Sequence, residues 1–356
     1  VSFVRFANWC ARVGLRSPVG LNTVEGAPRT CRFVSADGKG CACKDFRAAA
    51  GSANMCRCGH RCHGHRSDSA QQTLQMQLLS SRPAHWVSSG IGLVPLTDPA
   101  VLSQMQFLLD ATHLESNNWT RDRGCALHGV NRCGNDCIFA NRARVPTGYR
   151  LVGAWRNQNP ALWARYSLMR ATILQECRKT PCARCNLESS SPAFESIDAS
   201  GLVGKINECR LFHGTSASAC REICEKNFQL SLAGTGATWK TPGKSTGKSL
   251  YGPGVYLAER ITKADEYAQG VPGDAGAPQV FSILLCRALA GRVCVCEDNE
   301  IDPDALRQQV LDGPYHCVLG DRVAKLGKPF REVVIYDRDQ LYPEFLLTYT
   351  RILPHT

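Results

Sequence analysis

Short apolar runs separated by turn-forming residues fill the C-terminal part of the chain, residues 206–356. Runs of this length and spacing are typical of β-strands. The pattern predicts helices at 217–227 and 261–269, and strands at 211–213, 228–233, 255–257, 279–287, 292–295, 315–318, 332–336 and 341–349. Many short strands with few, separate helices indicate an α+β fold with a largely antiparallel sheet.

The middle of the chain alternates helical and strand-like patterns. Apolar residues recur at helical spacing over 99–110, after an Asp98-Pro99 start, and again over 159–175. Residues 147–153 alternate like a strand, and the Ser-rich stretch 186–205 is expected to be a loop. We therefore expect the α+β domain to extend over residues 95–356.

The N-terminal residues are organised differently. Residues 1–30 are poorly patterned, 31–66 are dense in Cys and His, and 67–94 are rich in Ser and Gln. We predict an N-terminal segment at 1–30, a zinc-binding module at 31–66 and a linker at 67–94.

The composition is that of a globular protein, with 44% hydrophobic and 21% charged residues. The net charge of +11 leaves two interpretations open, a site for polyanions such as nucleic acid, and a merely basic surface. The most apolar stretch, 280–295, is interrupted by Arg287 and Arg292, so we expect no membrane span.

The expected location is nuclear or cytoplasmic. The chain opens on Val1, so we expect its natural start to lie upstream. Residues 1–24 carry Arg5, Arg12 and Arg16 and no acidic residue, which leaves mitochondrial targeting as an alternative.

The chain contains twenty cysteines, which is a high number. A disulfide framework of a small secreted protein is not expected, because the chain is long and has enough apolar residues for a hydrophobic core. Residues 41–65 contain two Cys-x-Cys knuckles about fifteen residues apart, the second followed by histidines. This pattern predicts a structural Zn²⁺ site whose metal supplies folding energy. The predicted ligands are Cys43, Cys58, His60 and His65, with Cys41 and Cys56 as alternates.

Two further groups of metal-ligating residue types are weaker. We expect the cysteines of both groups to be free, buried thiols rather than metal ligands. They are Cys125, His128, Cys133 and Cys137, and Cys177, Cys182 and Cys185.

The strand end at Leu211-Phe-His-Gly-Thr215 carries candidate chemistry. Gly214 exposes a backbone donor and acceptor with no side chain in the way, which suits a primary carboxamide. His213 beside it is able to donate to a ribose hydroxyl. Taken alone, the pair is better explained as a turn glycine beside a histidine whose hydrogen bonds are satisfied.

An aromatic pair and a carboxylate follow. Tyr256 and Tyr267 are able to clamp a flat ring between them, although each also suits a core. Glu332 opens an otherwise apolar strand, where a carboxylate is able to bind a ribose hydroxyl or stabilise an oxocarbenium-like transition state. A strand-capping surface glutamate is the ordinary alternative.

Taken together and in order, these segments resemble the poly(ADP-ribose) polymerase catalytic domain family over about three quarters of the chain. The resemblance implies an ADP-ribosyltransferase-like split antiparallel β-sheet with flanking helices. It rests on seven segments, namely 148–163, Leu211-Phe-His-Gly-Thr215, Tyr251-Gly-Pro-Gly-Val-Tyr-Leu-Ala-Glu259, Lys263-Ala-Asp-Glu-Tyr267, Val318-Leu-Gly-Asp-Arg322, Arg331-Glu-Val-Val-Ile-Tyr-Asp337 and 340–349.

The resemblance also implies a site for NAD⁺ as substrate. It assigns the adenosine-side ribose to His213, the nicotinamide carboxamide to the backbone of Gly214, beside Thr215, and the packing of the nicotinamide to Tyr256 and Tyr267. Glu332 matches the catalytic glutamate, which binds the nicotinamide ribose and helps to activate the acceptor. His213 and Tyr256 complete the catalytic set.

The sequence departs from the family at Ala264, where a serine usually helps to hold the carboxamide. Thr262 is not assumed to replace it. One such hydrogen bond is worth roughly 0.5–1.5 kcal/mol, so we expect weaker NAD⁺ binding. Residues 234–250, with Lys240, Lys244 and Lys248, match the loop beside the cofactor, and we expect these lysines to be solvated rather than to face the pyrophosphate.

The resulting prediction is an NAD⁺-dependent protein ADP-ribosyltransferase, a poly(ADP-ribose) polymerase that modifies protein acceptors and itself. The glutamate at 332 distinguishes the chain from family members that carry an apolar residue there and add one ADP-ribose. Two alternatives stay open. One is mono-ADP-ribosyl transfer only, and the other is a catalytically inactive, zinc-tethered scaffold that binds NAD⁺ or a partner.

Overall fold

The structure is a computed structural model. It describes residues 92–114, 145–187, 201–232, 249–271, 278–298 and 301–353, with Pro83, Trp86 and the backbone of 48–49 and 52–56. The chain divides into two compact units, 1–82 and 83–356. In the first unit, β1 (Ala48–Ala49) pairs antiparallel with β2 (Ser52–Cys56), two strands that the sequence pattern did not predict.

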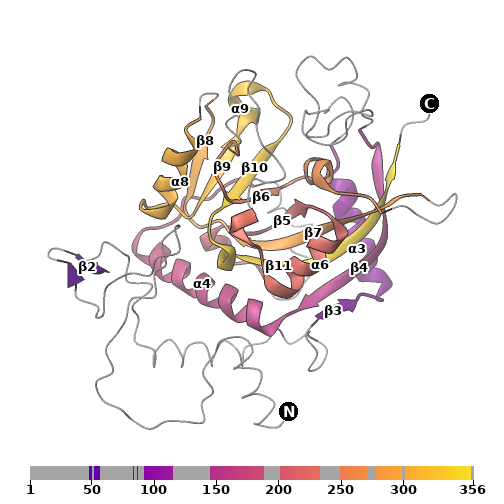
Figure 1. Cartoon of the computed structure of the whole chain (residues 1–356), viewed down its shortest axis with the longest axis horizontal. Coiled ribbons are helices and arrows are strands. Elements are labelled where there is room, and N and C mark those ends of the chain that lie inside the picture. Colours follow the sequence, from indigo (N-terminus) through magenta and orange to yellow (C-terminus); the bar gives the residue numbers. More distant parts are fainter. Residues whose placement is uncertain are drawn as a thin grey trace, which may run out of the picture. The chain divides into compact units, whose positions relative to one another are not determined.

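The described part of the second unit is built on a sheet of nine strands in the order β3-β4-β11-β7-β5-β6-β10-β9-β8 (Figure 1). With the helices around it, this sheet confirms the predicted α+β class. The strands are β3 (Gly92–Pro95), β4 (Gly148–Gln158), β5 (Glu208–Gly214), β6 (Val255–Ala258), β7 (Val280–Leu289), β8 (Val293–Cys296), β9 (Cys317–Asp321), β10 (Arg331–Ile335) and β11 (Leu341–Ile352).

The sheet is mixed rather than wholly antiparallel. β8 and β9 run parallel, with Val293 opposite Cys317. A parallel pair needs a crossover connection, and here α8 (Pro303–Leu311) supplies it, a helix that the sequence analysis did not predict. The other strand pairs of this sheet that the structure describes are antiparallel.

Two helices begin where the sequence predicts. Asp98 caps α3 (Pro99–Ala111) by accepting a hydrogen bond from the backbone N–H of Ala100 at 2.9 Å. Asn159 caps α4 (Pro160–Lys179) in the same way. In both helices proline at the first position needs no hydrogen-bond partner for its nitrogen, so cap and proline together fix the helix start.

Alternation along β7 distributes the core over both faces of the sheet. Ile283 and Leu285 pack in the cluster that contains α3, while Leu284 and Cys286 pack in the cluster that contains α6 (Ala217–Lys226). Because successive side chains of a strand point to opposite faces, a strand buried on both sides reads as a continuous apolar run.

Two predictions in this region were wrong. The stretch 228–233 is not a strand but carries a short 3₁₀ turn, η6 (Leu230–Leu232), in which Leu232 is exposed. The predicted helix 261–269 is shorter and divides into α7 (Ile261–Ala264) and the 3₁₀ turn η7 (Asp265–Tyr267).

A charged network lies inside the core. Arg210 and Arg287, both about 1% exposed, bind Glu344 at 2.7 and 2.8 Å, and Arg287 also binds Glu208 at 3.4 Å. Burial alone would raise the pKa of Glu344, but the two guanidinium groups more than offset it and hold that pKa far below its usual range. Glu208 also accepts a hydrogen bond from Tyr166.

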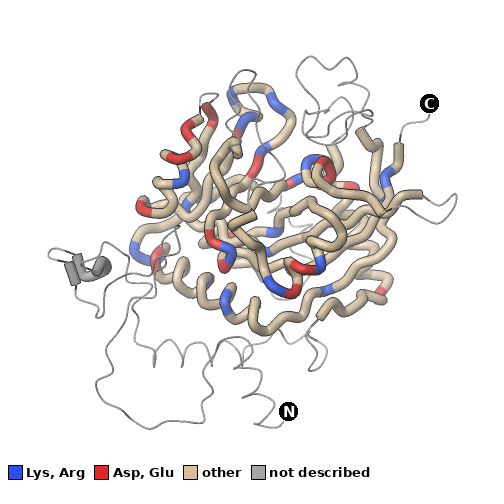
Figure 2. Tube along the Cα trace, in the orientation of Figure 1, with Lys and Arg blue, Asp and Glu red and all other residues tan. Residues whose placement is uncertain are grey.

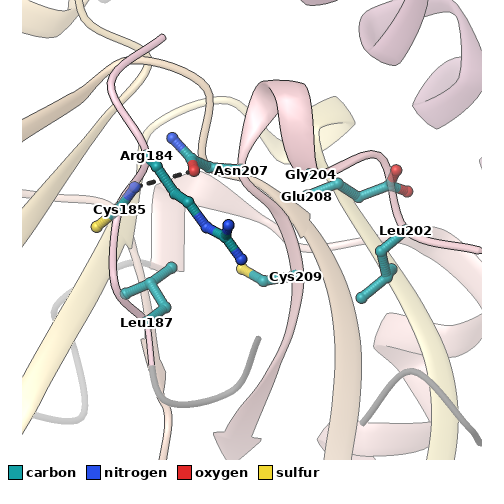
Figure 3. Close-up of a pocket in the computed structure, with 8 residues that line it drawn as sticks. All are labelled: Arg184, Cys185, Leu187, Leu202, Gly204, Asn207, Glu208 and Cys209. Carbon is teal, nitrogen blue, oxygen red and sulfur yellow. Dashed lines mark hydrogen bonds between the residues drawn. The ribbon is translucent and has the colours of Figure 1, made fainter. Parts of the chain in front are cut away.

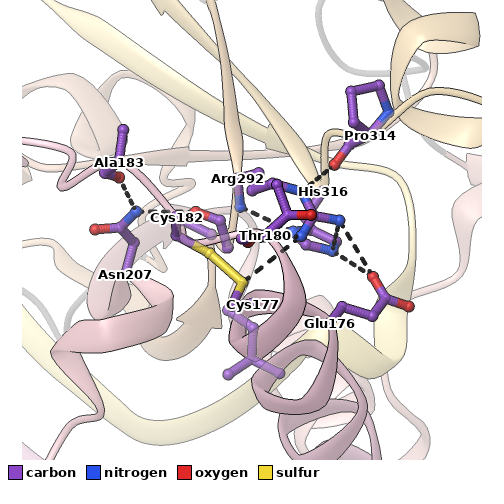
Figure 4. The surroundings of a disulfide bond; sticks show 12 residues. Glu176, Cys177, Thr180, Cys182, Ala183, Asn207, Arg292, Pro314 and His316 are labelled. Atoms are coloured by element: carbon purple, nitrogen blue, oxygen red, sulfur yellow. Dashed lines mark hydrogen bonds and ion pairs between the residues drawn. A yellow bond between two sulfur atoms is a disulfide. The ribbon is translucent and has the colours of Figure 1, made fainter.

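The end of α4 carries a disulfide between Cys177 and Cys182 (Figure 4). The expectation of free thiols is therefore wrong for this pair, whereas Cys185 is free. The spacing is short enough for one turn after the helix to bring the two sulfurs together. Arg292 forms an ion pair with Glu176, the residue before Cys177, and donates a hydrogen bond to the carbonyl of Thr180. Because Arg292 directly precedes β8, these contacts join the turn to the sheet.

Both acidic and basic residues lie along α8, β9 and α9 (Arg322–Leu326), so the net positive charge is not gathered there (Figure 2). Within the described ranges, no helix combines the length and the apolar character needed to cross a membrane.

Candidate active site

The site begins where two neighbouring strands separate. β5 and β6 pair at a single position, Phe212 opposite Ala258. Beyond it the strands diverge, and the ring of His213 bridges the gap by a 3.0 Å hydrogen bond from its Nδ1 to the carbonyl of Tyr256. We call this separation between β5 and β6 the split, although the two strands belong to one nine-stranded sheet.

The bond from His213 fixes its tautomer. A carbonyl only accepts, so Nδ1 carries the proton and Nε2 is an acceptor in the neutral ring. Burial lowers the pKa of His213, which the bond to Tyr256 offsets in part, so the neutral form prevails near pH 7. In this tautomer Nε2 is an acceptor rather than a donor, and the binding of a ribose hydroxyl by His213 stays a prediction.

Gly214 lies against the chain of α7. A Cβ at this position would lie 1.8 Å from the carbonyl oxygen of Ala264, so only glycine fits. The next residue, Thr215, accepts a hydrogen bond at its carbonyl from the backbone N–H of Gln269. These contacts join the end of β5 to the segment that carries Tyr267.

Tyr256 is held at both ends. Its hydroxyl donates to the carbonyl of Gly252 at 3.0 Å and accepts from the backbone N–H of Tyr251 at 2.8 Å. Burial raises the pKa of Tyr256, so its hydroxyl stays protonated. Tyr256 as a whole is partly buried.

Glu332 stands on β10 between two small residues. It lies opposite Ala258 on β6 and opposite Gly320 on β9. Two residues along, Val334 lies opposite Tyr256, so Glu332 and Tyr256 point to the same face of the sheet. The register therefore brings this carboxylate next to the split between β5 and β6.

Tyr267 is carried by η7, whose first residue is firmly anchored. Asp265, which is fully buried, accepts from the Tyr349 hydroxyl at 2.6 Å and from Arg351 Nε at 2.8 Å. Thr262 is also fully buried, and its hydroxyl accepts from the backbone N–H of Leu114 at 2.9 Å. Whether Thr262 replaces the missing serine stays untested.

The family model described as "Poly(ADP-ribose) polymerase catalytic domain" matches residues 139–351, more than half of the chain. The chain belongs to this family. The resemblance drawn from the seven sequence segments is thereby confirmed, and the domain just described is an ADP-ribosyltransferase domain of the poly(ADP-ribose) polymerase type.

Curated relatives match part of the chain. Protein mono-ADP-ribosyltransferase PARP10 of Mus musculus is 27% identical over 211 residues, 58% of this chain and 17% of that protein. Protein mono-ADP-ribosyltransferase PARP12 of Homo sapiens is 26% identical over 145 residues, 41% of this chain and 17% of that protein. Protein mono-ADP-ribosyltransferase PARP11 of Mus musculus is 24% identical over 156 residues, 41% of this chain and 44% of that protein. The chain thus spans less than half the length of each of these relatives.

One charged residue near Glu332 was not predicted from the sequence to belong to the site. Lys263 on α7 is 6% exposed, and its ammonium lies 2.8 Å from Glu266 and 3.8 Å from Glu332. It also lies 5.2 Å from the ring centroid of Tyr267. The Lys-x-x-Glu spacing in the sequence could have indicated the pair of Lys263 and Glu266. The pair of Lys263 and Glu332 could not be found in this way, because it depends on the register of the sheet.

Several predicted residues lie outside the described residues, so their roles stay predictions. Among the residues that the structure describes, no group of three or more Cys, His, Asp or Glu side chains is arranged to hold a metal. The undescribed positions are the zinc candidates Cys41, Cys43, Cys58, His60 and His65, the side chain of Cys56, the lysines Lys240, Lys244 and Lys248, and Cys125, His128, Cys133 and Cys137.

A small pocket lies apart from the predicted NAD⁺ site. It opens beside the turn that follows α4, and none of the predicted site residues lines it (Figure 3). Its lining residues are Arg184, Cys185, Leu187, Leu202, Gly204, Asn207, Glu208 and Cys209.

Proposed function

We propose that the protein is an NAD⁺-dependent ADP-ribosyltransferase that moves ADP-ribose to a protein acceptor and releases nicotinamide. The observation that carries this proposal is the placement of Glu332 beside the opening between β5 and β6, on the same face as Tyr256. Family membership supports it independently.

In the proposed site, the backbone of Gly214 binds the nicotinamide carboxamide, and the rings of Tyr256 and Tyr267 pack around the nicotinamide. His213 accepts a hydrogen bond at Nε2 from the adenosine-side ribose. Thr215 lies next to Gly214, and its carbonyl accepts a hydrogen bond from the backbone N–H of Gln269. Each of these roles follows from the family resemblance, and the contacts around each residue support it.

The chemistry proposed for Glu332 is electrostatic. As the bond between nicotinamide and ribose breaks, positive charge develops on the ribose carbon, and a nearby carboxylate stabilises it. The acceptor then attacks that carbon and loses its proton. The ammonium of Lys263 lies 3.8 Å from the carboxylate of Glu332 and forms an ion pair with it.

Single transfer is the product that the relatives favour, because their names describe mono-ADP-ribosyltransferases. Extension into a polymer is the second candidate, and the specific observation in its favour is a carboxylate at position 332 rather than an apolar side chain. The predicted partners beyond NAD⁺ and protein acceptors, nucleic acid or poly(ADP-ribose), stay a prediction from charge.

The test is incubation of the full chain with NAD⁺ labelled in the ADP-ribose part, followed by denaturing electrophoresis. A sharp labelled band supports single transfer, and a ladder or smear supports extension. Glu332→Gln keeps the shape of the side chain and removes its charge, so labelling should fall at least a hundredfold. Equal labelling of both proteins would remove Glu332 from the mechanism, and no labelling of either would refute the transferase proposal.

A further inference from the structure

The hydroxyl of Tyr251 is an unusual feature of the domain. Tyr251 is fully buried, and its hydroxyl has no hydrogen-bond partner within the described structure. A buried polar group without a partner destabilises a fold, so such a group needs an explanation.

The position of Tyr251 is fixed from both sides of its backbone. Its N–H donates to the hydroxyl of Tyr256 at 2.8 Å, and its carbonyl accepts from the hydroxyl of Tyr336. These two bonds fix the backbone of Tyr251, and its ring is fully buried in the cluster that contains Val318 and Val334.

The phenol end of Tyr251 occupies the place facing Glu332. Gly320 lies opposite Glu332 in the ladder of β9 and β10. A Cβ added to Gly320 would lie 2.1 Å from Cζ and 2.3 Å from the hydroxyl oxygen of Tyr251. Side chains that face each other across antiparallel strands have Cβ atoms about 5 Å apart. The Tyr251 hydroxyl thus stands where the cross-strand neighbour of Glu332 would stand.

The electrostatics agree with this placement. Burial raises the pKa of Tyr251, and the negative charge of Glu332 raises it further, while Arg322 and Lys263 lower it. A protonated hydroxyl beside a carboxylate has one evident use, which is to donate a hydrogen bond to it.

We propose that Tyr251 is a positioning residue, whose hydroxyl donates to the carboxylate of Glu332 when NAD⁺ is bound and holds that carboxylate toward the nicotinamide ribose. This inference rests on the proposed function. Lys263 holds one side of Glu332 only at 3.8 Å and binds Glu266 more closely, at 2.8 Å. A hydrogen bond from the Tyr251 hydroxyl would add a contact to the carboxylate from the side of β9.

The test compares the kinetics and stability of wild type, Tyr251→Phe and a matched control, Tyr342→Phe. Tyr342 is also buried, but it belongs to another cluster and its hydroxyl donates to Asn157 at 2.7 Å. For Tyr251→Phe we expect kcat to fall about tenfold or more, since a hydrogen bond to a charged group is lost, with KM for NAD⁺ within about twofold. Its unfolding temperature should equal or exceed that of wild type, because only an unpaired hydroxyl is removed. Tyr342→Phe should show the reverse, a lower unfolding temperature and an unchanged kcat.

A double variant separates positioning from folding. If Tyr251 acts through Glu332, Tyr251→Phe should cause no further loss of NAD⁺ turnover in a Glu332→Gln background. An unchanged kcat for Tyr251→Phe, a fall in its unfolding temperature, or additive losses in the double variant would each overturn the inference. An inactive wild type would instead refute the proposed function itself.

Discussion

At the scale of single residues, the contact between Gly214 and Ala264 determines how the proposed nicotinamide grip is built. The glycine is needed because of the 1.8 Å approach that a Cβ would make to the Ala264 carbonyl. The sequence alone suggested a glycine with exposed backbone groups, but not which element it packs against, because that contact depends on the path of α7.

The first prediction concerns Gly214→Ala. The added methyl group must push β5 and α7 apart, which should lower the free energy of unfolding by about 1–3 kcal/mol and abolish binding of a nicotinamide analogue. Thermal unfolding with and without benzamide measures both effects. Gly204→Ala is the matched control, because a Cβ there meets nothing within 4 Å, and its ligand-induced shift should equal that of wild type. A normal shift for Gly214→Ala would contradict the proposed grip.

The second prediction concerns Ala264→Ser, which restores the residue that the family usually has. Ala264 is 3% exposed and lies directly beside Gly214. An added hydrogen bond of roughly 0.5–1.5 kcal/mol should tighten binding of nicotinamide analogues by about threefold to tenfold in calorimetric titration. Unchanged or weaker binding would show that the carboxamide does not sit beside residue 264.

Much of the candidate site could be predicted from sequence order, because the family motifs place His213, Tyr256 and Glu332 on three separate strands. Lys263 and Tyr251 could not, since a 3.8 Å ion pair and an unpaired hydroxyl arise from the register of β9, β10 and β6. The tautomer of His213 was likewise beyond the sequence, because it depends on a backbone carbonyl of another strand.

At the scale of elements, the turn η7 is positioned by one buried carboxylate. Asp265 gathers a guanidinium from Arg351 and the hydroxyls of Tyr149 and Tyr349 from β4 and β11. These strands are far from Asp265 in the sequence, so β4 and β11, near one edge of the sheet, determine where Tyr267 lies.

The third prediction is that Asp265→Ala destabilises the protein strongly. It leaves Arg351 without its buried partner, and breaking such a pair costs about 3–5 kcal/mol. Urea unfolding should show this loss, whereas Glu297→Ala, which removes an exposed ion pair with Lys325, should cost less than about 1 kcal/mol. Similar losses for the two variants would mean that η7 is not held through Asp265.

Most elements with strong periodicity were predicted, and the failures have local causes. The stretch 228–233 looks like a strand by composition, but Asn227 with a φ of 70° turns the chain and Phe228 alone is buried there. α8 has no fully buried residue and so carries little apolar periodicity. Its existence follows instead from the parallel pairing of β8 and β9.

At the scale of the whole molecule, the buried network around Glu344 links stability to pH. Its carboxyl pKa is lowered in the folded state, so the unfolded state binds more protons in acid. The stabilisation is present at neutral pH and is lost as pH falls below the unfolded value of about 4.3.

The fourth prediction follows from this linkage. Wild type should lose unfolding free energy steadily below about pH 4, while Glu344→Gln should be less stable by about 3–5 kcal/mol at pH 7 and show a flatter dependence on pH. Chemical unfolding at a series of pH values measures both slopes. Parallel slopes would assign the acid sensitivity to other groups.

The central claim is that the carboxylate beside the split sheet drives ADP-ribosyl transfer from NAD⁺. The most direct measurement follows nicotinamide release and label transfer together, with NAD⁺ labelled in the ADP-ribose part, for wild type, Glu332→Gln and the remote variant Glu297→Gln. The account predicts equal nicotinamide release and protein labelling for wild type and Glu297→Gln, and at least a hundredfold loss of both for Glu332→Gln. Transfer that persists in Glu332→Gln at the wild-type rate would contradict it.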